Sequence, residues 1–322
     1  MSERYKALIV GAGKIAGGYN AGPDDDMVLT HALAYLRHPK FDLVACVEPN
    51  SEARDAFVKK WGIPRGYASL DAALKDGGFD TVSVCSPTGT HLVALEKLLA
   101  SDVARVFAEK PLDGDVVAAR KLADAFANKK VPVAVNYTRR FDPAMKTLKA
   151  EIASGKYGEL YSLVGWYDGG VMNNGSHLFD LANYLTGQAA RLSQIARSGQ
   201  SVPDPSVSAL AMLGETPFHI VARPAGAGSR FELEIACLQA IVTIEDGGFA
   251  VRNRRYGSSA TFAGEKVLQR GDWTATRFGE AMLAALDELA AWQHTGELSS
   301  DMNSASHAIE LASTIRKRAS ER

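Results

Sequence analysis

Short apolar runs alternate with amphipathic segments through the first part of the chain. Each run has the length and the aliphatic content of a strand buried on both faces. The segments between the runs repeat apolar residues at three- and four-residue spacing, which is typical of helices packed on one side. This rhythm predicts a parallel sheet covered by helices on both faces. The strands are expected at 6–10, 42–47, 80–85, 104–108 and 131–136.

Several of the helices expected between these strands have recognisable caps. Ser51, Ser69 and Thr90 each stand where a side-chain oxygen can accept a hydrogen bond from the first turn of a helix. A further helix is expected over about 114–129, with Val117 on its buried side.

The helix expected after the first strand is interrupted. Residues 17–26 contain glycines, a proline and a run of aspartates, a composition typical of a loop. A helix is expected to resume after a cap at Thr30 and to end before Pro39. The interruption is interpreted either as a solvated insertion or as a lid near a ligand site.

The pattern changes after about residue 137. A helix near 143–154 is followed by runs in which apolar and polar residues alternate, as in Phe231-Glu232-Leu233-Glu234-Ile235. Such alternation indicates strands with one wet face, and therefore a largely antiparallel sheet. The strands are expected at 159–167, 207–213, 217–223, 230–236, 238–245 and 248–252. Helices are expected again at about 274–294 and 303–319.

A glycine-rich turn follows the first expected strand at once. The sequence Gly11-Ala12-Gly13-Lys14-Ile15-Ala16 fits the G-x-G-x-x-A pattern of a dinucleotide-binding turn. Gly11 permits a tight turn, and Gly13 has no side chain to keep a pyrophosphate from the backbone. Ala16 lets the following helix pack close to the strand, so that its N-terminus can face the phosphates. Glycines also close many ordinary turns, and this alternative stays open for the motif alone. The cofactor-binding residues predicted here are Gly11, Gly13, Lys14, Ile15 and Ala16.

Glu48 ends the second expected strand. A carboxylate at this position can accept both ribose hydroxyls of an adenosine and repels a 2′-phosphate. NAD is therefore predicted as the cofactor, and Arg54 leaves NADP as the less favoured choice. The alternative is an exposed acid at a strand end.

Composition narrows the possible partners. A chain of 322 residues is long enough for two domains. The formal net charge of −1 gives no basic excess for nucleic acid, and no apolar run is long enough to span a bilayer. Cys46, Cys85 and Cys237 are odd in number and two of them lie in strand-like runs, so no disulfide framework is predicted. None of them has a second Cys or His at zinc spacing, so no metal site is predicted either. A cytoplasmic location is expected.

Two polar loops follow later strands of the parallel sheet. Ser86, Pro87, Thr88 and His91 come after the strand at 80–85, and Glu109-Lys110-Pro111 comes after the next one. Ligands bind outside the carboxyl ends of parallel strands. Lys110 is thus either a solvated surface charge or a cation directed into a ligand site.

The order of the motifs resembles the family of glucose–fructose oxidoreductase, inositol dehydrogenase and MocA. After G-x-G-x-x-A come S-P-T-x-T-H at 86–91, E-K-P at 109–111 and the segment 136–143, which begins Asn136-Tyr137-Thr138. The later segments 155–159 and 175–180 match the family as well.

The resemblance implies a two-domain architecture. The expected fold is α/β, with a doubly wound N-terminal Rossmann domain over 1–136 and a C-terminal α+β domain with an open, mainly antiparallel sheet over 137–322. It also implies an active site between the domains, and a homodimer or homotetramer formed through the C-terminal sheet.

The resemblance further implies hydride transfer between nicotinamide and a sugar or polyol hydroxyl. The lysine of E-K-P, here Lys110, is expected to hydrogen-bond the reacting oxygen and to contact the cofactor, as are Ser86, Pro87, Thr88, His91 and Glu109. Burial and a cationic nicotinamide are expected to lower the pKa of Lys110. His177 is expected to be the acid/base.

The chain departs from the family at Asn173, where an aspartate is expected. Asparagine cannot raise the pKa of His177 as a carboxylate would, but it can exchange hydrogen bonds with a hydroxyl. Some family members that oxidise nucleotide sugars carry a similar asparagine, which favours that substrate class. Tyr137, Arg140 and Tyr167 complete the expected substrate contacts, together with Lys110, Asn173 and His177.

Two other functions stay open. Some members of the family retain NAD and hydrolyse glycosides by transient oxidation, elimination and re-reduction. The missing aspartate also permits a binding protein that senses the cofactor without catalysis.

Overall fold

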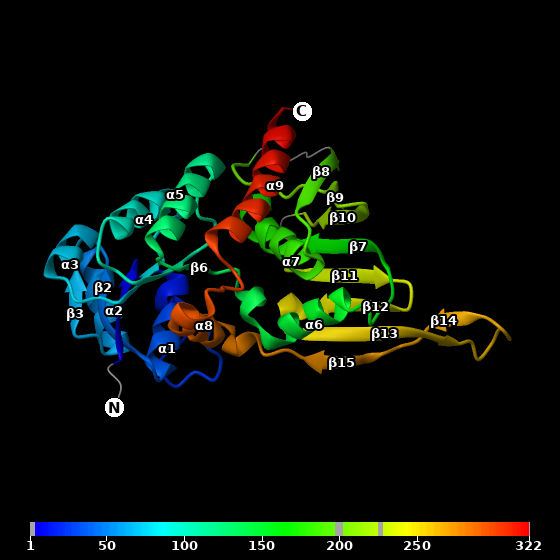
Figure 1. Cartoon of the computed structure of the whole chain (residues 1–322), viewed down its shortest axis with the longest axis horizontal. Helices are drawn as coiled ribbons and strands as arrows, with labels where there is room; N and C mark the ends of the chain where they lie inside the picture. The colour runs from blue at the N-terminus through cyan, green and yellow to red at the C-terminus, as the bar shows by residue number, and fades with distance from the viewer. Residues whose placement is uncertain (1–3, 197–201, 225–227, 322) are drawn as a thin grey trace. The chain divides into compact units, whose positions relative to one another are not determined.

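The computed structural model describes residues 4–196, 202–224 and 228–321. The chain forms two compact units, of which the first comprises residues 1–141 and 279–306 and the second comprises 142–278 and 307–322 (Figure 1). The division expected at 136/137 lies close to the first change of unit. It does not hold further along, because residues 279–306 pack with the first unit instead of the second.

The first unit contains a six-stranded parallel sheet. Its strand order is β3-β2-β1-β4-β5-β6, so the chain reverses its direction of progress between β1 and β4. The predicted strands are confirmed, and the missed one is the short, half-buried β3. The bounds are β1 (Tyr5–Val10), β2 (Phe41–Val47), β3 (Arg65–Tyr67), β4 (Thr81–Val84), β5 (Arg105–Ala108) and β6 (Val133–Val135).

Helices cover both faces of this sheet, as expected for a doubly wound fold (Figure 1). The core against one face combines side chains from β1, α1, α2 and α8, while α4 and α5 pack against each other. The bounds are α1 (His31–Arg37), α2 (Ser51–Trp61), α3 (Leu70–Asp76), α4 (His91–Leu99), α5 (Val116–Lys129) and α8 (Ala281–Thr295).

The helix caps were only partly predicted. Thr30 caps α1 and Ser69 caps α3, both as expected. The prediction for α2 was wrong by one residue, because Asn50 accepts the hydrogen bond from Ala53 N at 2.9 Å and Ser51 is already helical. The expectation that Val117 lies on the buried side of α5 was wrong, because its side chain is 65% exposed. The buried face of α5 is formed by Ala119, Leu122, Ala123 and Phe126.

The interruption after β1 has a defined structure. Lys14–Gly18 form a single π-helical turn, and a loop then leads to α1. Within this loop the buried side chain of Asn20 donates to Asp25 and accepts from Thr30 Oγ1 at 2.9 Å. Lys60 donates to the carbonyls of Gly17 and Asn20. The insertion is therefore tied to α2 and to the start of α1.

Residues 279–306 complete the first unit in two ways. Met282, Leu286 and Leu289 of α8 are buried in its core. Beyond α8, the chain runs along the outer edge of β6, where Val135 N donates to the carbonyl of Ser300 at 3.0 Å. The edge strand is thus covered by chain that is far away in sequence.

The second unit contains a large mixed sheet. Its order is β14-β13-β12-β11-β7-β10-β9-β8, with β15 paired to β13, and β7 and β10 are parallel while the other pairs are antiparallel within the described residues. The bounds are β7 (Leu160–Tyr167), β8 (Ala190–Ile195), β9 (Ala209–Leu213), β10 (Thr216–Ala222), β11 (Glu232–Cys237), β12 (Ala240–Glu245), β13 (Ala250–Ser258), β14 (Lys266–Leu268) and β15 (Asp272–Ala275).

This sheet has one covered face and one open face. Alternate residues of β7 are buried, as are those of β10. The helix α6 (Pro143–Ala153) packs on α7 (Ser176–Thr186), which lies against β7 and β11. The mainly antiparallel prediction is confirmed. The helix expected from 274 was wrong at its start, because 272–275 form β15 and α8 begins at Ala281.

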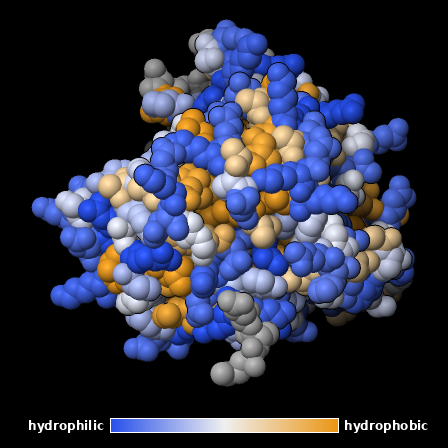
Figure 2. Space-filling model, turned by 60° about the vertical axis from the view of Figure 1, so that its left-hand side comes forward, coloured by the Kyte–Doolittle hydropathy of each residue, from blue (hydrophilic) through white to orange (hydrophobic). Residues whose placement is uncertain are grey.

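The last helix, α9 (Met302–Ser320), begins in the first unit and ends in the second. The surface in Figure 2 is mainly hydrophilic, with separate apolar patches. In the part of the chain that the structure describes, every helix is too short or too polar to cross a membrane.

Candidate cofactor and active site

The glycine turn after β1 brings three strands together at their carboxyl ends. Gly11 has φ +95°, and a Cβ there would lie 2.8 Å from the backbone of Cys85 and Ser86. Its N–H donates to the carbonyl of Val47 at 2.7 Å. Only glycine fits this position, because a side chain would both strain the backbone and collide with the end of β4.

Gly13 occupies the opposite kind of environment. It is exposed, and a Cβ built on it would find nothing within 4 Å. The open space lies at the start of the Lys14–Gly18 turn, where backbone N–H groups can meet an anion. The two glycines thus serve different purposes, since Gly11 closes the turn and Gly13 leaves room for a ligand.

A pocket of about 450 Å³ opens beside this turn. Its wall includes the carboxyl ends of β1 and β2, the start of α3 and the loop that leads into α4. It therefore sits where the strand order reverses between β1 and β4, the place where doubly wound sheets bind nucleotides. The residues present fit an adenosine and its diphosphate.

Glu48 lies in the wall of this pocket. One carboxylate oxygen accepts from Ala12 N at 3.1 Å, and the other accepts from Asn50 N at 3.0 Å. Arg54 donates to the main-chain carbonyl of Glu48 at 2.8 Å. The carboxylate is thus anchored to the glycine turn, while the guanidinium is engaged by the backbone.

His91 joins the two predicted loops of the first unit. Its ring is 1% exposed and lies 2.7 Å from the Ser86 carbonyl and 2.8 Å from the Pro111 carbonyl. Lys110 and Pro111 are connected by a cis peptide bond. The buried His91 therefore ties together the loops that carry Ser86 and Lys110, and these two loops form one surface at the ends of β4 and β5.

Glu109 is buried beneath that surface. His31 Nε2 lies 2.8 Å from its Oε1, and Asn136 donates to the same oxygen at 2.6 Å. Burial acts to raise the pKa of Glu109, but the hydrogen bond and electrostatic interaction with His31, the hydrogen bond from Asn136 and the charge of Lys110 together outweigh it and lower the pKa below its ordinary value. The carboxylate is thus an anion held inside the protein. The sequence offered no sign that His31 would be its partner.

The second unit carries the turn that contains Asn173. Residues Gly170–Gly175 form a π-helical turn that runs directly into α7. The carboxylate of Asp204 accepts from Met172 N at 2.8 Å and from Asn173 N at 3.1 Å. A Cβ on Gly170 would lie 2.1 Å from that carboxylate. Asp204, which sequence reasoning missed, therefore fixes the turn, and Gly170 makes room for it.

Other predicted substrate residues differ in exposure. Asn173 is exposed and His177 is half-buried, four positions further along on α7. Tyr167 is fully buried, and its hydroxyl donates to the carbonyl of Val207 at 2.9 Å and accepts from Val207 N at 2.7 Å. This pairing supports a structural role for Tyr167. Tyr137 and Arg140 are also buried, and Arg140 donates to the carbonyl of Ser299 at 3.1 Å.

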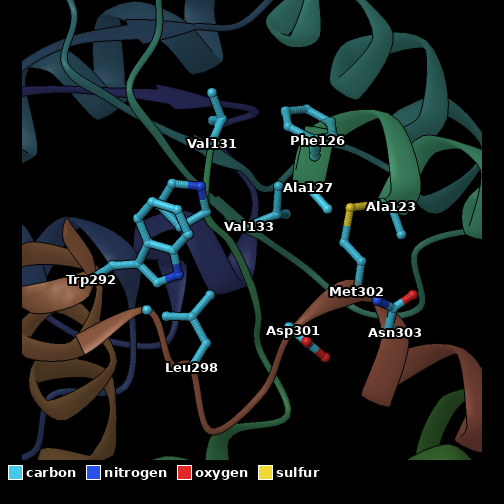
Figure 3. A pocket seen from close by; sticks show the side chains of 12 residues that line it. Ala123, Phe126, Ala127, Val131, Val133, Trp292, Leu298, Asp301, Met302 and Asn303 are labelled. Atoms are coloured by element: carbon cyan, nitrogen blue, oxygen red, sulfur yellow. The ribbon is translucent and has the colours of Figure 1, made fainter. Parts of the chain in front are cut away.

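A second hollow in the first unit has a different character. It has a volume of about 190 Å³ and lies between α5, β6 and the end of α8. Figure 3 shows Phe126, Trp292 and Met302 around it, and Asp301 also lines it. The Asp301 carboxylate accepts from Ser304 N at 2.7 Å at the start of α9. The lining is mainly apolar and offers no arrangement for catalysis.

Comparison with known proteins agrees with this geometry. The profile of an oxidoreductase family with an NAD-binding Rossmann fold matches residues 5–137. The rhizopine catabolism protein MocA of Rhizobium meliloti is 27% identical over 209 residues, which cover 61% of each chain. The inositol 2-dehydrogenase of the same organism is 27% identical over 172 residues, covering 49% of this chain and 51% of the relative.

Similarity of structure extends over nearly the whole chain. An oxidoreductase from Agrobacterium radiobacter, solved in complex with NAD+, L-tartaric acid and magnesium, superposes with a TM-score of 0.75. The alignment covers 98% of this chain and 96% of that one at 16% identity, so the likeness concerns the fold. In sequence, the matched part spans only about half to three fifths of the two curated relatives.

Proposed function

We propose that this chain is a member of the oxidoreductase family of glucose–fructose oxidoreductase, inositol dehydrogenase and MocA, and that it is an NAD-dependent dehydrogenase of a sugar or polyol CH–OH group. The observation that carries the proposal is the pocket at the switch point, with Gly13 open to a diphosphate and Glu48 anchored in the wall. The loop with Lys110 leaves the same edge of the sheet.

The proposed chemistry assigns one task to each residue. NAD, when bound, supplies the acceptor for the hydride. Lys110 donates a hydrogen bond to the reacting oxygen and stabilises the negative charge that develops there. His177 takes the hydroxyl proton, or returns it in the reverse direction. Asn173 orients the substrate through its amide. Arg140 and Tyr137, which are buried, hold the segment that follows β6.

The substrate proposed is a nucleotide sugar. Its support is Asn173, which stands exposed where the family has an aspartate. An assay with NAD and a panel of inositols, free sugars, glycosides and nucleotide sugars tests this, with reduced nicotinamide as the readout. We expect NAD to be reduced in the presence of nucleotide sugars and not in the presence of the other compounds of the panel. Release of an aglycone without free reduced cofactor would show the hydrolase chemistry instead, and binding without either product would show a sensor.

Replacement of Glu48 by glutamine is expected to weaken NAD binding by about 10-fold or more, because charge-assisted hydrogen bonds to the ribose contribute about 1.5–3 kcal/mol. The loss of negative charge should also narrow the preference for NAD over NADP. Isothermal titration with both cofactors measures the two effects. Glu52→Gln, which removes an exposed carboxylate from the first turn of α2, is the matched control. Unchanged NAD affinity in Glu48→Gln would contradict the assignment.

Replacement of Asp204 by alanine is expected to lower the free energy of unfolding by about 2–3 kcal/mol, because two main-chain donors lose a charged acceptor. Activity should fall as well, since the turn with Asn173 is then unsupported. Chemical denaturation and steady-state kinetics measure the changes. Asp204→Asn keeps one side-chain oxygen as an acceptor and should lose less than half as much stability. Equal losses in the two variants would argue against the hydrogen bonds as the cause.

We also propose that the open face of the second unit's sheet joins identical subunits. This face carries the ion pairs Arg252–Glu245 at 2.8 Å and Arg254–Glu234 at 3.0 Å, and Trp273 beside them is 60% exposed. Trp273→Ser is expected to raise the dissociation constant of the assembly about 30-fold, the effect of losing about 2 kcal/mol at an interface tryptophan. Light scattering over a dilution series measures this. Val117→Ser removes an exposed apolar side chain from the first unit and should change nothing.

A further inference from the structure

A chain of buried polar side chains lies directly below the loop that carries Lys110. His31 Nδ1 lies 2.9 Å from Ser83 Oγ, and Ser83 Oγ lies 2.8 Å from the Tyr35 hydroxyl. On the other side, His31 Nε2 reaches Glu109 Oε1 at 2.8 Å. Tyr35, Ser83 and His31 are completely buried, and Glu109 is 7% exposed. We call these four residues the buried relay.

Hydrogen-bond accounting gives the relay a direction. The Glu109 carboxylate only accepts, so His31 Nε2 must carry a hydrogen. If Ser83 donates to Nδ1, then Tyr35 can donate to Ser83, and each hydroxyl hydrogen has an acceptor. If Ser83 donated to the Tyr35 hydroxyl instead, the hydrogen of that hydroxyl would have no acceptor among the hydrogen bonds of the described residues. The relay is therefore satisfied with His31 donating to Glu109 and accepting from Ser83.

The relay is not a nucleophilic triad, although it contains a serine, a histidine and a carboxylate. Both Ser83 and His31 have no exposed surface, and the His31 ring packs against Phe107 with centroids 4.4 Å apart. A substrate cannot reach the serine oxygen. The relay can therefore influence the chemistry only through the Glu109 carboxylate, which lies at its other end.

Several groups face the Glu109 carboxylate inside the first unit. His31 approaches from α1 and Asn136 from the end of β6, each with a donor. The Cys85 thiol follows β4, and burial together with the charge of Glu109 raises its pKa well above the ordinary value, so it stays neutral. Lys110, the next residue in the chain, also acts on the Glu109 carboxylate through its charge.

We infer that the Glu109 end of the buried relay controls the charge state of Lys110: His31 and Asn136 hold the Glu109 carboxylate ionised and in one orientation, and this anion keeps Lys110 in its ammonium form. This inference rests on the proposed role of Lys110. A cation beside nicotinamide and partly shielded from water would otherwise lose its proton more easily. Glu109 and His31 would thereby extend activity to higher pH without touching the substrate.

The test is the pH profile of kcat/KM in four variants. Glu109→Gln removes the anion and keeps the shape, so the alkaline limb should move to lower pH by about one unit, the size of one close charge–charge interaction. His31→Leu removes the donor to Glu109 and should move the limb in the same direction. His31→Gln restores an N–H donor at the Nε2 position and should return the limb toward that of the wild type. Tyr35→Phe removes only the hydroxyl at the end of the relay farthest from Glu109, and the alkaline limb should stay at the same pH as in the wild type.

The outcomes separate two claims. If Lys110→Met keeps its turnover, the proposed role of the lysine fails, whatever the other variants do. If Lys110→Met loses turnover but Glu109→Gln keeps the wild-type limb and is merely slower or less stable, the inference is overturned and Glu109 has a structural role only. Should Glu109→Gln not fold, as judged by circular dichroism and NAD binding, the two His31 variants decide the matter. Equal limbs in His31→Leu and His31→Gln would overturn it too.

Discussion

Replacing Lys110 by methionine is expected to lower kcat by about 10²- to 10³-fold, the effect of removing one preorganised donor from a developing oxyanion. Methionine keeps the length of the side chain but neither donates a hydrogen bond nor carries a charge. NAD should still bind, with the loss of only the contact expected from Lys110, since the glycine turn and Glu48 lie at the ends of other strands of the sheet. Steady-state kinetics and cofactor titration on the same preparation separate the two effects.

A matched control supports this measurement. Lys75→Met removes an exposed lysine from the last turn of α3 and should leave kcat unchanged. Full turnover in Lys110→Met would exclude the lysine from the chemistry. A large loss of NAD affinity with little loss of kcat would instead make it a cofactor ligand.

The two glycines of the phosphate turn should respond very differently to alanine. Gly11→Ala is expected to lower the free energy of unfolding by about 2–5 kcal/mol, because it combines a left-handed backbone with overpacking against Cys85 and Ser86. Gly13→Ala should leave stability nearly unchanged, since a Cβ there has nothing within 4 Å. It should nevertheless weaken NAD binding by about 100-fold or more, because the methyl group occupies the space left for the diphosphate.

Denaturant unfolding and NAD titration of both variants measure this contrast. Retained NAD affinity in Gly13→Ala would mean that the diphosphate does not pass this turn. Unchanged stability in Gly11→Ala would mean that the turn relaxes without cost. The pair thus tests the fold and the ligand site independently.

Local patterns predicted the first unit well because its strands are buried on both faces. Such strands are continuous apolar runs, and five of the six were found at the expected places. The exception, β3, has only three residues and lies at the edge, so no hydrophobic run marks it. In the second unit the sequence pattern missed β8, β14 and β15, which lie at or near the edges of the sheet, where burial imposes less pattern.

Candidate site residues could be predicted where a local motif determines their position. Gly11, Gly13 and Glu48 could be placed because a turn and a strand end determine them locally. His31 and Asp204 could not be predicted, because each contacts a segment that is distant in the sequence and close only in the folded protein. The histidine meets Glu109 across 78 residues, and the aspartate meets Met172 across 32. No short-range signal distinguishes such partners from surface residues.

The return of residues 279–306 to the first unit determines when that unit can fold during synthesis. A ribosome makes the glycine turn and the six parallel strands early, but α8 and the cover of β6 emerge only after the whole insertion 142–278. Until then the nascent chain presents a bare strand edge and the apolar surface that Met282 and Leu286 later fill. We expect a truncated protein ending near residue 141 to aggregate in the cell, and chaperones to bind the growing chain at this stage.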